Sequence, residues 1–443
     1  MQVGLNEAAP LASKDQSTIT RACQSSRLSF TKDEHGNRMF DPAELERVGP
    51  GESHRMPASQ AGTAAPGQER PRWRRLRRRT NEAAMELSAT LAVLRREPHP
   101  LRVVRRLVLA ADRAGMKPRE VFVFDLDRRS DEPAGAFLSK RSAVRIQDIL
   151  NPAQHHHLVQ DKLAYHIACV ERGVAAPRIL AVLGFGPDGD RAAELRAQRI
   201  DGEADLEAFL TSQLDGTRLI FKKINGSHGE GLLALTVSGA GAIAVDGTNL
   251  DAAAILRHCE VYRSGRGYLV QHWLQPDPAF GPVMPGPALG AVRLITMLIG
   301  QEVQIPFGTI RLPIGSNVID DLDFGRTGNL IAEVGLTDGT LGRAWGPSRT
   351  RAHRLEICPV RPDTGAPIEG FRIPHWPEIL RVVSTGARAF PELTTLGWDV
   401  VVTSDGIQLL EANHHWDPHG TQVTLQRGIG PEMAGFLAQA RPS

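Results

Sequence analysis

Cysteine is scarce in this chain, and its placement excludes two common kinds of small domain. The 443 residues contain four cysteines, which stand far apart and form no CxxC pair: Cys23, Cys169, Cys259 and Cys358. This pattern argues against a zinc ribbon or a disulfide framework, and it is typical of a reducing compartment. Cys169 and Cys259 each have a histidine nearby but no third, orienting group, so we interpret them as buried, inert thiols.

Long apolar runs are also lacking. No stretch approaches the ~18 apolar residues of a membrane span, and residues 1–17 carry no apolar core of a secretory signal. The hydrophobic content of 41% and the charged content of 23% are ordinary for a globular protein, and the net charge is only +2. We therefore expect a cytoplasmic protein with two or three domains.

Charge is unevenly distributed near the N-terminus. Residues 1–80 are polar and show no sustained period, which predicts a mostly disordered arm. Seven arginines lie between Arg70 and Arg79 at the end of this arm. Such a cluster can contact nucleic acid or an anionic membrane surface, but we favour a solvated basic arm leading into a helix, because no structured partner motif accompanies it.

Beyond the arm, hydrophobic periodicity predicts a helical region followed by a β-rich region. Helices are expected from Asn81 to Leu94 and around 103–110, and then over 158–170, 203–214, 376–390 and 431–440. Strands are expected over 121–124, 178–183, 219–224, 232–237, 267–274, 291–299 and 304–312.

Two apolar, β-rich runs near the C-terminus flank the turn Ser404-Asp405-Gly406. A hairpin centred on Asp405 pairs Asp399 with Glu411 and places Asn413 on the same face. Opposed carboxylates repel unless a cation lies between them, and two carboxylates with an amide suit Mg²⁺ or Mn²⁺. The alternative is a solvated hairpin face whose acids never meet.

A second motif, residues 221–231, consists of a strand end with two lysines followed by a glycine-containing loop. Glycines allow backbone N–H groups to approach phosphate oxygens, and a lysine adds positive charge. The Walker A order is absent, and a Gly-rich hairpin that only turns remains an alternative. Lys222 and Lys223 point to opposite faces of the strand, and the spacing does not choose between them.

Arg293 stands inside an otherwise apolar strand, so it needs a partner. It is either a clamp on a transferring phosphoryl group or part of a structural ion pair. The run His155-His156-His157 invites a metal interpretation, but consecutive histidines in a helix point in different directions, so we favour a polar helix start. His414 and His415 follow Asn413 directly, at the mouth of the predicted metal site.

Together these residues resemble the ATP-grasp superfamily, and most closely the sugar-transfer-associated ATP-grasp family, which is related to α-L-glutamate ligases. The resemblance runs from about Asp161 to Gly430, and its motifs follow the family's order: Asp161-Lys162, Gly173-x-x-x-Pro177, Lys223 with 226–231, Tyr268–Leu274, Ala291–Thr296, Arg361–Gly365, Gly370-Phe371, Ile373-Pro374-x-Trp376, Gly397–Asp399 and Glu411–Asn413.

The resemblance implies an α/β (α+β) ATP-grasp fold, with ATP between two antiparallel β-sheets and a helical N-terminal region. The implied divisions are an arm (1–80), a helical and pre-ATP-grasp region (81–214), a lid (215–275) and a C-terminal catalytic subdomain (276–443). It implies catalytic roles for Arg293 and Lys223, and Mg²⁺ (or Mn²⁺) ligation by Asp399, Glu411 and Asn413. The implied ATP contacts are Lys162, Lys223, Gly226, Ser227, Gly229, Gly231, Gln271 and Leu274.

The activity implied is ATP- and Mg²⁺-dependent ligation, in which a carboxylate is activated as an acyl phosphate and attacked by an amine. The substrates would be a small-molecule, sugar or peptide-like acid and an amine, in polysaccharide or secondary-metabolite biosynthesis. Two alternatives remain open, an ATP-grasp kinase that forms ADP without an amine, and a catalytically silent ATP-binding module. Substrate specificity is expected between Gln301 and Gly370, with Arg311, Asn317 and residues 325–328 as candidates.

Overall fold

The structure is a computed structural model of the chain. It describes residues 72–129, 134–184, 186–226, 229, 231–262, 266–286 and 288–440, with side chains from Thr80 onward. Three short strands nearer the N-terminus, in a separate compact unit (1–75), pair in the order β1-β3-β2: β1 (Val3–Gly4), β2 (Thr31–Lys32) and β3 (Arg38–Phe40). The remainder of the predicted arm up to residue 71, and the side chains of residues 72–79, lie outside the described residues.

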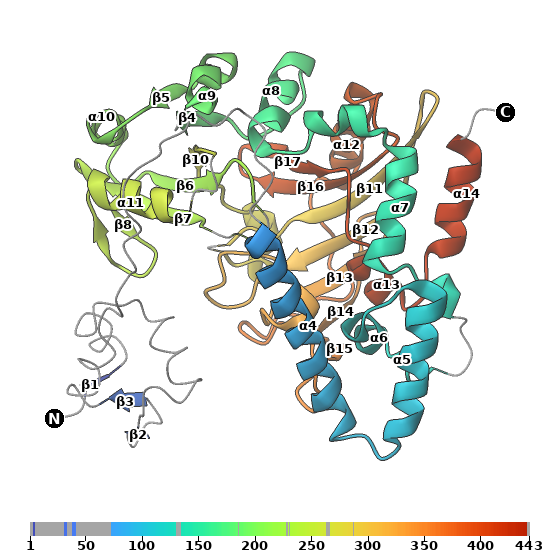
Figure 1. Cartoon of the computed structure of the whole chain (residues 1–443). Coiled ribbons are helices and arrows are strands. Elements are labelled where there is room, and N and C mark those ends of the chain that lie inside the picture. Colours follow the sequence, from blue (N-terminus) through green and yellow to red (C-terminus); the bar gives the residue numbers. More distant parts are fainter. Residues whose placement is uncertain are drawn as a thin grey trace. The chain divides into compact units, whose positions relative to one another are not determined.

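The second unit (76–443) contains two seven-stranded sheets, shown in green to yellow and in yellow to red in Figure 1. The first sheet has the order β5 (Gln198–Ile200), β4 (Ile179–Leu183), β10 (Tyr268–His272), β6 (Arg218–Lys223), β7 (Leu233–Ser238), β8 (Gly241–Ala244) and β9 (Asn249–Leu250). All its neighbours pair antiparallel except β4 and β5.

The second sheet is antiparallel throughout. Its order is β15 (Leu355–Ile357), β14 (Leu341–Pro347), β13 (Leu330–Val334), β12 (Glu302–Leu312), β11 (Val292–Ile299), β16 (Thr395–Thr403) and β17 (Gly406–Asn413). All nine residues of β16 are buried, as expected for a central strand covered on both faces. These two antiparallel-rich sheets confirm the predicted α/β architecture.

Helices cover both faces of the second sheet. Residues of α12 (Trp376–Ala389) pack on one face, where Leu294, Val400 and Leu409 are buried. On the other face, α7 (Lys140–Leu150) and α14 (Gly430–Ala440) pack against Ile295 and Met297. A further group lies at the β13–β15 end (Figure 1): α13 (His419–Leu425), α4 (Arg72–Leu94), α5 (Pro100–Ala114) and α6 (Pro118–Val123).

The first sheet has its own helices. α10 (Glu203–Thr211) and α11 (Ala252–Tyr262) cover the face that carries Phe221 and Val270. The opposite face, which carries Leu269, packs against α8 (Lys162–Arg172). The remaining short helical elements are α9 (Pro187–Asp190), η1 (Ala134–Ala136), η2 (Ala153–Leu158), η3 (Arg191–Leu195), η4 (Pro278–Val283) and η5 (Asp323–Gly325).

Helix α8 connects the two sheets. Leu163 and Ile167 pack on the first sheet, whereas Tyr165 belongs to the core of the second and donates from its hydroxyl to the carbonyl oxygen of Leu409 at 2.8 Å. The Asp161 side chain caps the helix by accepting from the Ala164 N–H at 2.7 Å, and Gly173 ends it at φ 67°. The helix therefore begins between the sheets, with Lys162 as its first residue.

The structure corrects some of the predicted elements. The strand predicted over 121–124 is wrong, because these residues lie in or next to helix α6, which begins at Pro118 with the backbone N–H of Lys117 donating to Glu120 Oε2 at 2.6 Å. A run of four buried apolar residues has no alternation to separate strand from helix. Helix α4 begins at Arg72 rather than at the predicted Asn81. The pattern also did not predict α7, α11 and β13–β15.

Several other expectations can be compared with the structure. Cys169 and Cys259 are buried, as predicted, and burial raises the pKa of both thiols to about 12. No helix among the described residues is both long enough and apolar enough to cross a membrane. The predicted divisions after 214 and 275 fall between secondary-structure elements, and the division into subdomains stays a prediction.

A half-buried, charged histidine joins α6 to the start of α13. His419 Nε2 lies 2.7 Å from Glu120 Oε1, and its Nδ1 lies 2.7 Å from Asp417 Oδ1. Burial opposes the charge on His419, but Asp417 and Glu120 outweigh it and raise the pKa of the imidazole from 6.5 to about 9. The contribution to stability is therefore fully present below pH 6.5 and is lost as the pH rises through about 9.

We predict that His419→Gln lowers the free energy of unfolding by on the order of 3 kcal/mol near neutral pH and by much less above about pH 10. Urea denaturation at both pH values measures the difference, with the exposed His157→Gln as the matched control. An equal loss at both pH values would show that the charge on His419 does not stabilise the fold.

Candidate active site

The hairpin of β16 and β17 brings the predicted metal ligands together. Asp399 pairs with Glu411, and Gly397 pairs with Asn413, so the two carboxylates and the amide share one region of the sheet. The pairing near the turn differs from the predicted hairpin centred on Asp405, because Thr403 pairs with Gly406 and the register shifts between Val400 and Asp399. The shift adds one residue to β17 and restores the predicted pairing at Asp399.

Asp399 is held by two arginines from neighbouring strands. Arg293, which pairs with Asp399 across β11 and β16, donates from Nε to Oδ1 at 2.6 Å and from Nη2 to Oδ2 at 2.9 Å. Arg311 of β12 donates from Nη2 to the same Oδ1 at 2.5 Å. Burial would raise the pKa of Asp399, but the two guanidinium groups prevail and lower it to about 2.

The charge network extends to a loop carboxylate, Asp320. Arg311 Nη1 lies 3.3 Å from Asp320 Oδ1, and Asp320 Oδ2 accepts from the backbone N–H of Ala291 at 3.1 Å. Burial and the nearby Asp399 raise the pKa of Asp320, although Arg311 opposes the rise. The result is an alternating Arg–Asp network, whose Arg293–Asp399 part is the ion pair that the sequence left as an alternative for this arginine.

The three predicted metal ligands differ in how many hydrogen bonds and ion pairs their oxygen atoms already make. Asp399 accepts three hydrogen bonds from arginines, whereas Glu411 is half-buried with Oε1 3.7 Å from Lys162 Nζ. The Asn413 amide nitrogen donates to the Gly397 carbonyl at 3.4 Å, which leaves its Oδ1 to accept. This oxygen-only set fits Mg²⁺ or Mn²⁺, with Asp399 available once an arginine turns to another anion.

Two lysines, Lys162 at the start of α8 and Lys222 of β6, approach these carboxylates. Lys162 Nζ donates to the carbonyl oxygen of Gly226 at 3.0 Å, and its backbone N–H donates to Ile224 O at 3.0 Å. Lys222 is half-buried, and burial followed by repulsion from Lys162 lowers its pKa to about 8, against the attraction of Glu411, Asp320 and Asp399. Cationic and anionic side chains therefore meet in one region, as the binding of a polyanion together with a metal ion requires.

Lys223 lies on the other face of β6. It pairs with Tyr268, and its side chain passes close to Gly226 and Gly231 on the side covered by α10 and α11. Phe221 is buried on that same face, whereas Lys222 shares the face of Leu269. The structure thus places the two lysines that the sequence could not rank on different faces, and the charges of Glu411 and Asp399 act on Lys222.

Two glycines of the loop permit close approach. Gly229 has φ 65°, and a Cβ there would lie 2.2 Å from Ile319 Cδ1. Gly231 has φ 71°, and a Cβ there would lie 2.6 Å from the Cβ of Tyr262. Any side chain at either position would clash and strain the backbone. Ser227 lies outside the described residues.

The remaining predicted contacts lie on or after β10. Gln271 is buried, with its Nε2 3.3 Å from Nε2 of His166, and burial with the charges of Lys222 and Lys162 lowers the pKa of His166 to about 3. Leu274 follows the strand in a half-buried position. In the predicted specificity region, Asn317 donates to Thr327 O at 3.0 Å, and its role in specificity stays a prediction.

His414 lies directly after Asn413 and is half-buried. Burial, together with His415 and His156, lowers its pKa to about 4, so the ring is neutral at pH 7. The sequence analysis did not connect His156 with this pair, nor Asp320 with Arg311. The predicted strands over 291–299 and 304–312 could have been paired as a hairpin. This pairing would have placed Arg311 near Arg293, because the two residues lie diagonally across the hairpin from each other.

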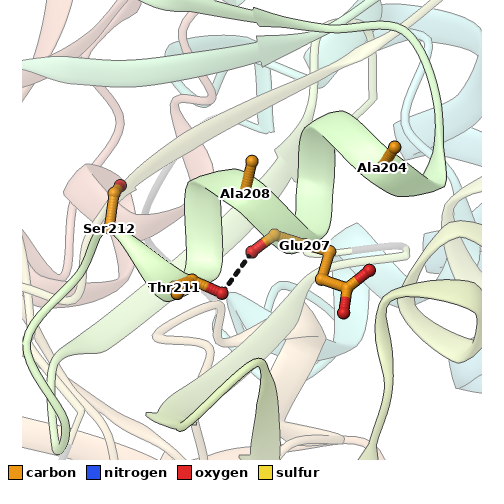
Figure 2. A pocket seen from close by; sticks show the side chains of 5 residues that line it. All are labelled: Ala204, Glu207, Ala208, Thr211 and Ser212. Carbon is orange, nitrogen blue, oxygen red and sulfur yellow. Dashed lines mark hydrogen bonds between the residues drawn. The ribbon is translucent and has the colours of Figure 1, made fainter.

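A surface hollow on α10 lies apart from these charged residues. Figure 2 shows its lining, which consists of exposed residues of α10 and the following serine, with Thr211 Oγ1 donating to Glu207 O at 2.8 Å: Ala204, Glu207, Ala208, Thr211 and Ser212. This hollow contains no opposed charges, no lysine and no arginine. It therefore lacks the cationic side chains that would neutralise a nucleoside triphosphate.

Comparison with known proteins gives one family match. Residues 141–436 match the family described as sugar-transfer associated ATP-grasp. No curated protein sequence matches the chain.

Three solved structures illustrate the structural similarity. The D-alanine-D-alanine ligase from Helicobacter pylori has 11% identity and a TM-score of 0.33, with 64% of this chain and 59% of that chain covered. The D-cycloserine synthetase DcsG has 12% identity and a TM-score of 0.36, over 68% and 78%. The biotin carboxylase–βγ-ATP complex from Campylobacter jejuni has 10% identity and a TM-score of 0.37, over 67% and 49%. The chain spans about three fifths of the Helicobacter ligase, and at these TM-scores we draw no conclusion from the similarities.

We predict that Asp399→Asn lowers the free energy of unfolding by about 3 kcal/mol, because the half-buried Arg293 and Arg311 lose the carboxylate that they share and Arg293 keeps only a neutral amide oxygen as its acceptor there. Chemical denaturation of the variant measures the loss. Asp405→Asn, in the exposed turn of the same hairpin, is the control and should change stability by less than about 0.5 kcal/mol. Equal stability of the two variants would contradict the structural role of the Arg–Asp network.

Proposed function

The chain belongs to the sugar-transfer associated ATP-grasp family, and we propose that it is an ATP- and Mg²⁺-dependent carboxylate–amine ligase that forms ADP. The observation that carries this proposal is the meeting of Lys162 and Lys222, from the first sheet and α8, with Glu411 and Asp399 of the second sheet. Cations on one side and paired carboxylates on the other match a triphosphate with its metal ion.

In this proposal, Lys162 and Lys222 bind the phosphates, whose negative charge relieves the repulsion between the two ammonium groups. Arg293 exchanges one bond to Asp399 for a phosphoryl oxygen, while Arg311 keeps the Asp399 carboxylate in place. Glu411, Asn413 and the freed oxygen of Asp399 would hold Mg²⁺ (or Mn²⁺), which would neutralise charge on the phosphates during transfer. Gln271 and Leu274, after the hinge strand β10, would border the adenine.

The reaction proposed has two steps. A carboxylate oxygen of the substrate attacks the γ-phosphorus, the bond to the β-phosphate oxygen breaks, and ADP leaves. The amine then attacks the acyl phosphate carbon, phosphate departs, and the amine proton passes to solvent. The glycine loop, whose close approach to Ile319 needs Gly229, would exclude water from the acyl phosphate.

The finer assignments are extensions of the same proposal. We propose residues 215–275 as the lid, 276–443 as the catalytic subdomain, and 81–214 as the helical region that precedes them. The family's description points to a sugar-linked or peptide-like acid in polysaccharide or secondary-metabolite biosynthesis. We place the reaction in the cytoplasm, where ATP is available.

We predict that Glu411→Gln lowers kcat by at least about 100-fold, because the developing charge on the phosphates loses a metal ligand. Mg²⁺-dependent ATP turnover with pooled uronic acids, amino acids and amines measures this, with ADP and AMP separated by chromatography. Glu260→Gln on the exposed surface of α11 is the matched control and should retain wild-type turnover.

The product pattern discriminates between the rival functions. ADP formation that requires both an acid and an amine supports the ligase. ADP formed with one substrate alone identifies a kinase, and AMP contradicts the acyl phosphate route. If ATP does not bind at all, the proposed nucleotide site is wrong.

We predict that Lys222→Met weakens ATP binding more than tenfold, whereas Lys223→Met, on the opposite face of β6, weakens it by less. Because the pKa of free Lys222 is about 8, ATP binding by the wild type should take up a proton, and affinity should fall as the pH rises through about 8. Calorimetry near pH 7 and near pH 9, in buffers of different ionisation enthalpy, measures both effects. A larger loss in Lys223→Met would return the phosphate contact to Lys223.

A further inference from the structure

Three histidines from two distant segments meet beside the end of β17. His156 comes from the short helix η2, and His414 and His415 follow directly after Asn413. The ring centroids of His156 and His414 lie 4.2 Å apart, as do those of His414 and His415. One ring nitrogen from each residue can be chosen such that all three lie within 4.8 Å of one another.

Two of the rings are oriented by hydrogen bonds from their Nε2 atoms. His156 Nε2 lies 2.8 Å from the carbonyl oxygen of Asn151, and His415 Nε2 lies 2.6 Å from Asp148 Oδ1. A carbonyl and a carboxylate oxygen only accept, so each Nε2 carries a hydrogen atom. In the neutral ring the opposite nitrogen, Nδ1, then has a free lone pair. Metal-binding histidines commonly show this pattern of hydrogen bonding to a carboxylate or a backbone carbonyl.

The segment that carries His156 is fixed to the hairpin. Asn151 is fully buried, and its amide nitrogen donates to the carbonyl oxygens of Thr395 at 2.8 Å and His414 at 3.1 Å. Its Oδ1 accepts from the backbone N–H of Thr395 at 3.0 Å. One asparagine therefore holds the backbone of η2 next to that of His414, so the three rings are brought together by the fold rather than by chance contact of long side chains.

We propose that His156, His414 and His415 bind a zinc ion, through Nδ1 of His156 and His415 and one nitrogen of His414. Imidazole nitrogen is a preferred zinc ligand, and three histidines with a solvent molecule complete a tetrahedral site. Nitrogen atoms about 2 Å from a tetrahedral ion lie about 3.3 Å apart. Ring nitrogens of these three residues that already lie within 4.8 Å of one another would therefore approach by about 1.5 Å at most. All three rings are half-buried, which leaves them room for this adjustment.

This site differs from the proposed magnesium site in chemistry and in purpose. It offers nitrogen rather than oxygen atoms, and none of its ligands is shared with Asp399, Glu411 or Asn413. Zinc bound there would tie the 148–156 segment to the end of β17, and so fix the position of Asn413. The fourth position would accept water or a carboxylate from a substrate. The inference does not depend on ligase activity.

The test uses the full-length chain without a histidine tag, freed of metal by a chelator, and titrated with Co²⁺ and then Zn²⁺. We expect one Co²⁺ per chain, with the intense visible absorption of a tetrahedral site, and its displacement by one Zn²⁺. His156→Ala and His415→Ala should each weaken Zn²⁺ binding by more than about 100-fold. Asp148→Asn, which removes only the orienting carboxylate, should weaken it by about 10- to 100-fold.

Two controls make the result specific. His157→Ala changes an exposed neighbour whose Nδ1 contacts Gln154 O, and Glu411→Gln changes the oxygen site; both should bind Zn²⁺ as the wild type does. Circular dichroism tests whether each variant is folded. If His156→Ala does not fold, the test relies on His415→Ala instead. Absence of a tetrahedral Co²⁺ spectrum, or Zn²⁺ affinity unchanged in the histidine variants, overturns the proposal. Loss of binding in Glu411→Gln alone would place the ion at the oxygen site and overturn it as well.

Discussion

The placement of Asp399 between Arg293 and Arg311 is the constraint on which the candidate site depends. The three residues lie on three adjacent strands, β16, β11 and β12, and their side chains are largely removed from water. Each charge would be very costly without the others, so the network fixes the order and register of these strands as well as the side chains. The same bonds keep Asp399 ionised and hold Arg293 next to the place where a phosphate is expected to bind.

Much of the fold follows from short-range sequence patterns. The periodicity of α12, the buried run of β16 and the glycine that ends α8 each act within about ten residues, so they can be read from the chain. The pairing of Asp399 with Glu411 was predictable for the same reason, since a hairpin converts sequence separation directly into position. The order of the motifs from Asp161 to Asn413 also made the family predictable from the sequence.

What was not predictable depends on contacts between distant segments. The face of β6 that receives α10 and α11 decides which of Lys222 and Lys223 meets the carboxylates, and nothing in the strand itself records that choice. Asp320 reaches Arg311 from a loop, and Asn151 brings His156 to His414 over more than 250 residues. The strand predicted over 121–124 was wrong for a different reason. A short apolar run that is buried on all sides has no polar positions, so its sequence shows no period that would distinguish a strand from a helix.

Because β17 contains one extra residue, the two strands pair in one register near the turn and in another register at the site. Between Thr403 and Val400 the strands pair in one register, and from Asp399 onward they pair in another. Without the extra residue, Asp399 would face Leu410, and Glu411 would point to the other side of the sheet. A turn one residue longer would give the site the same register with no bulge. Turn length and bulge can therefore be exchanged for one another during evolution or design, provided that both change together.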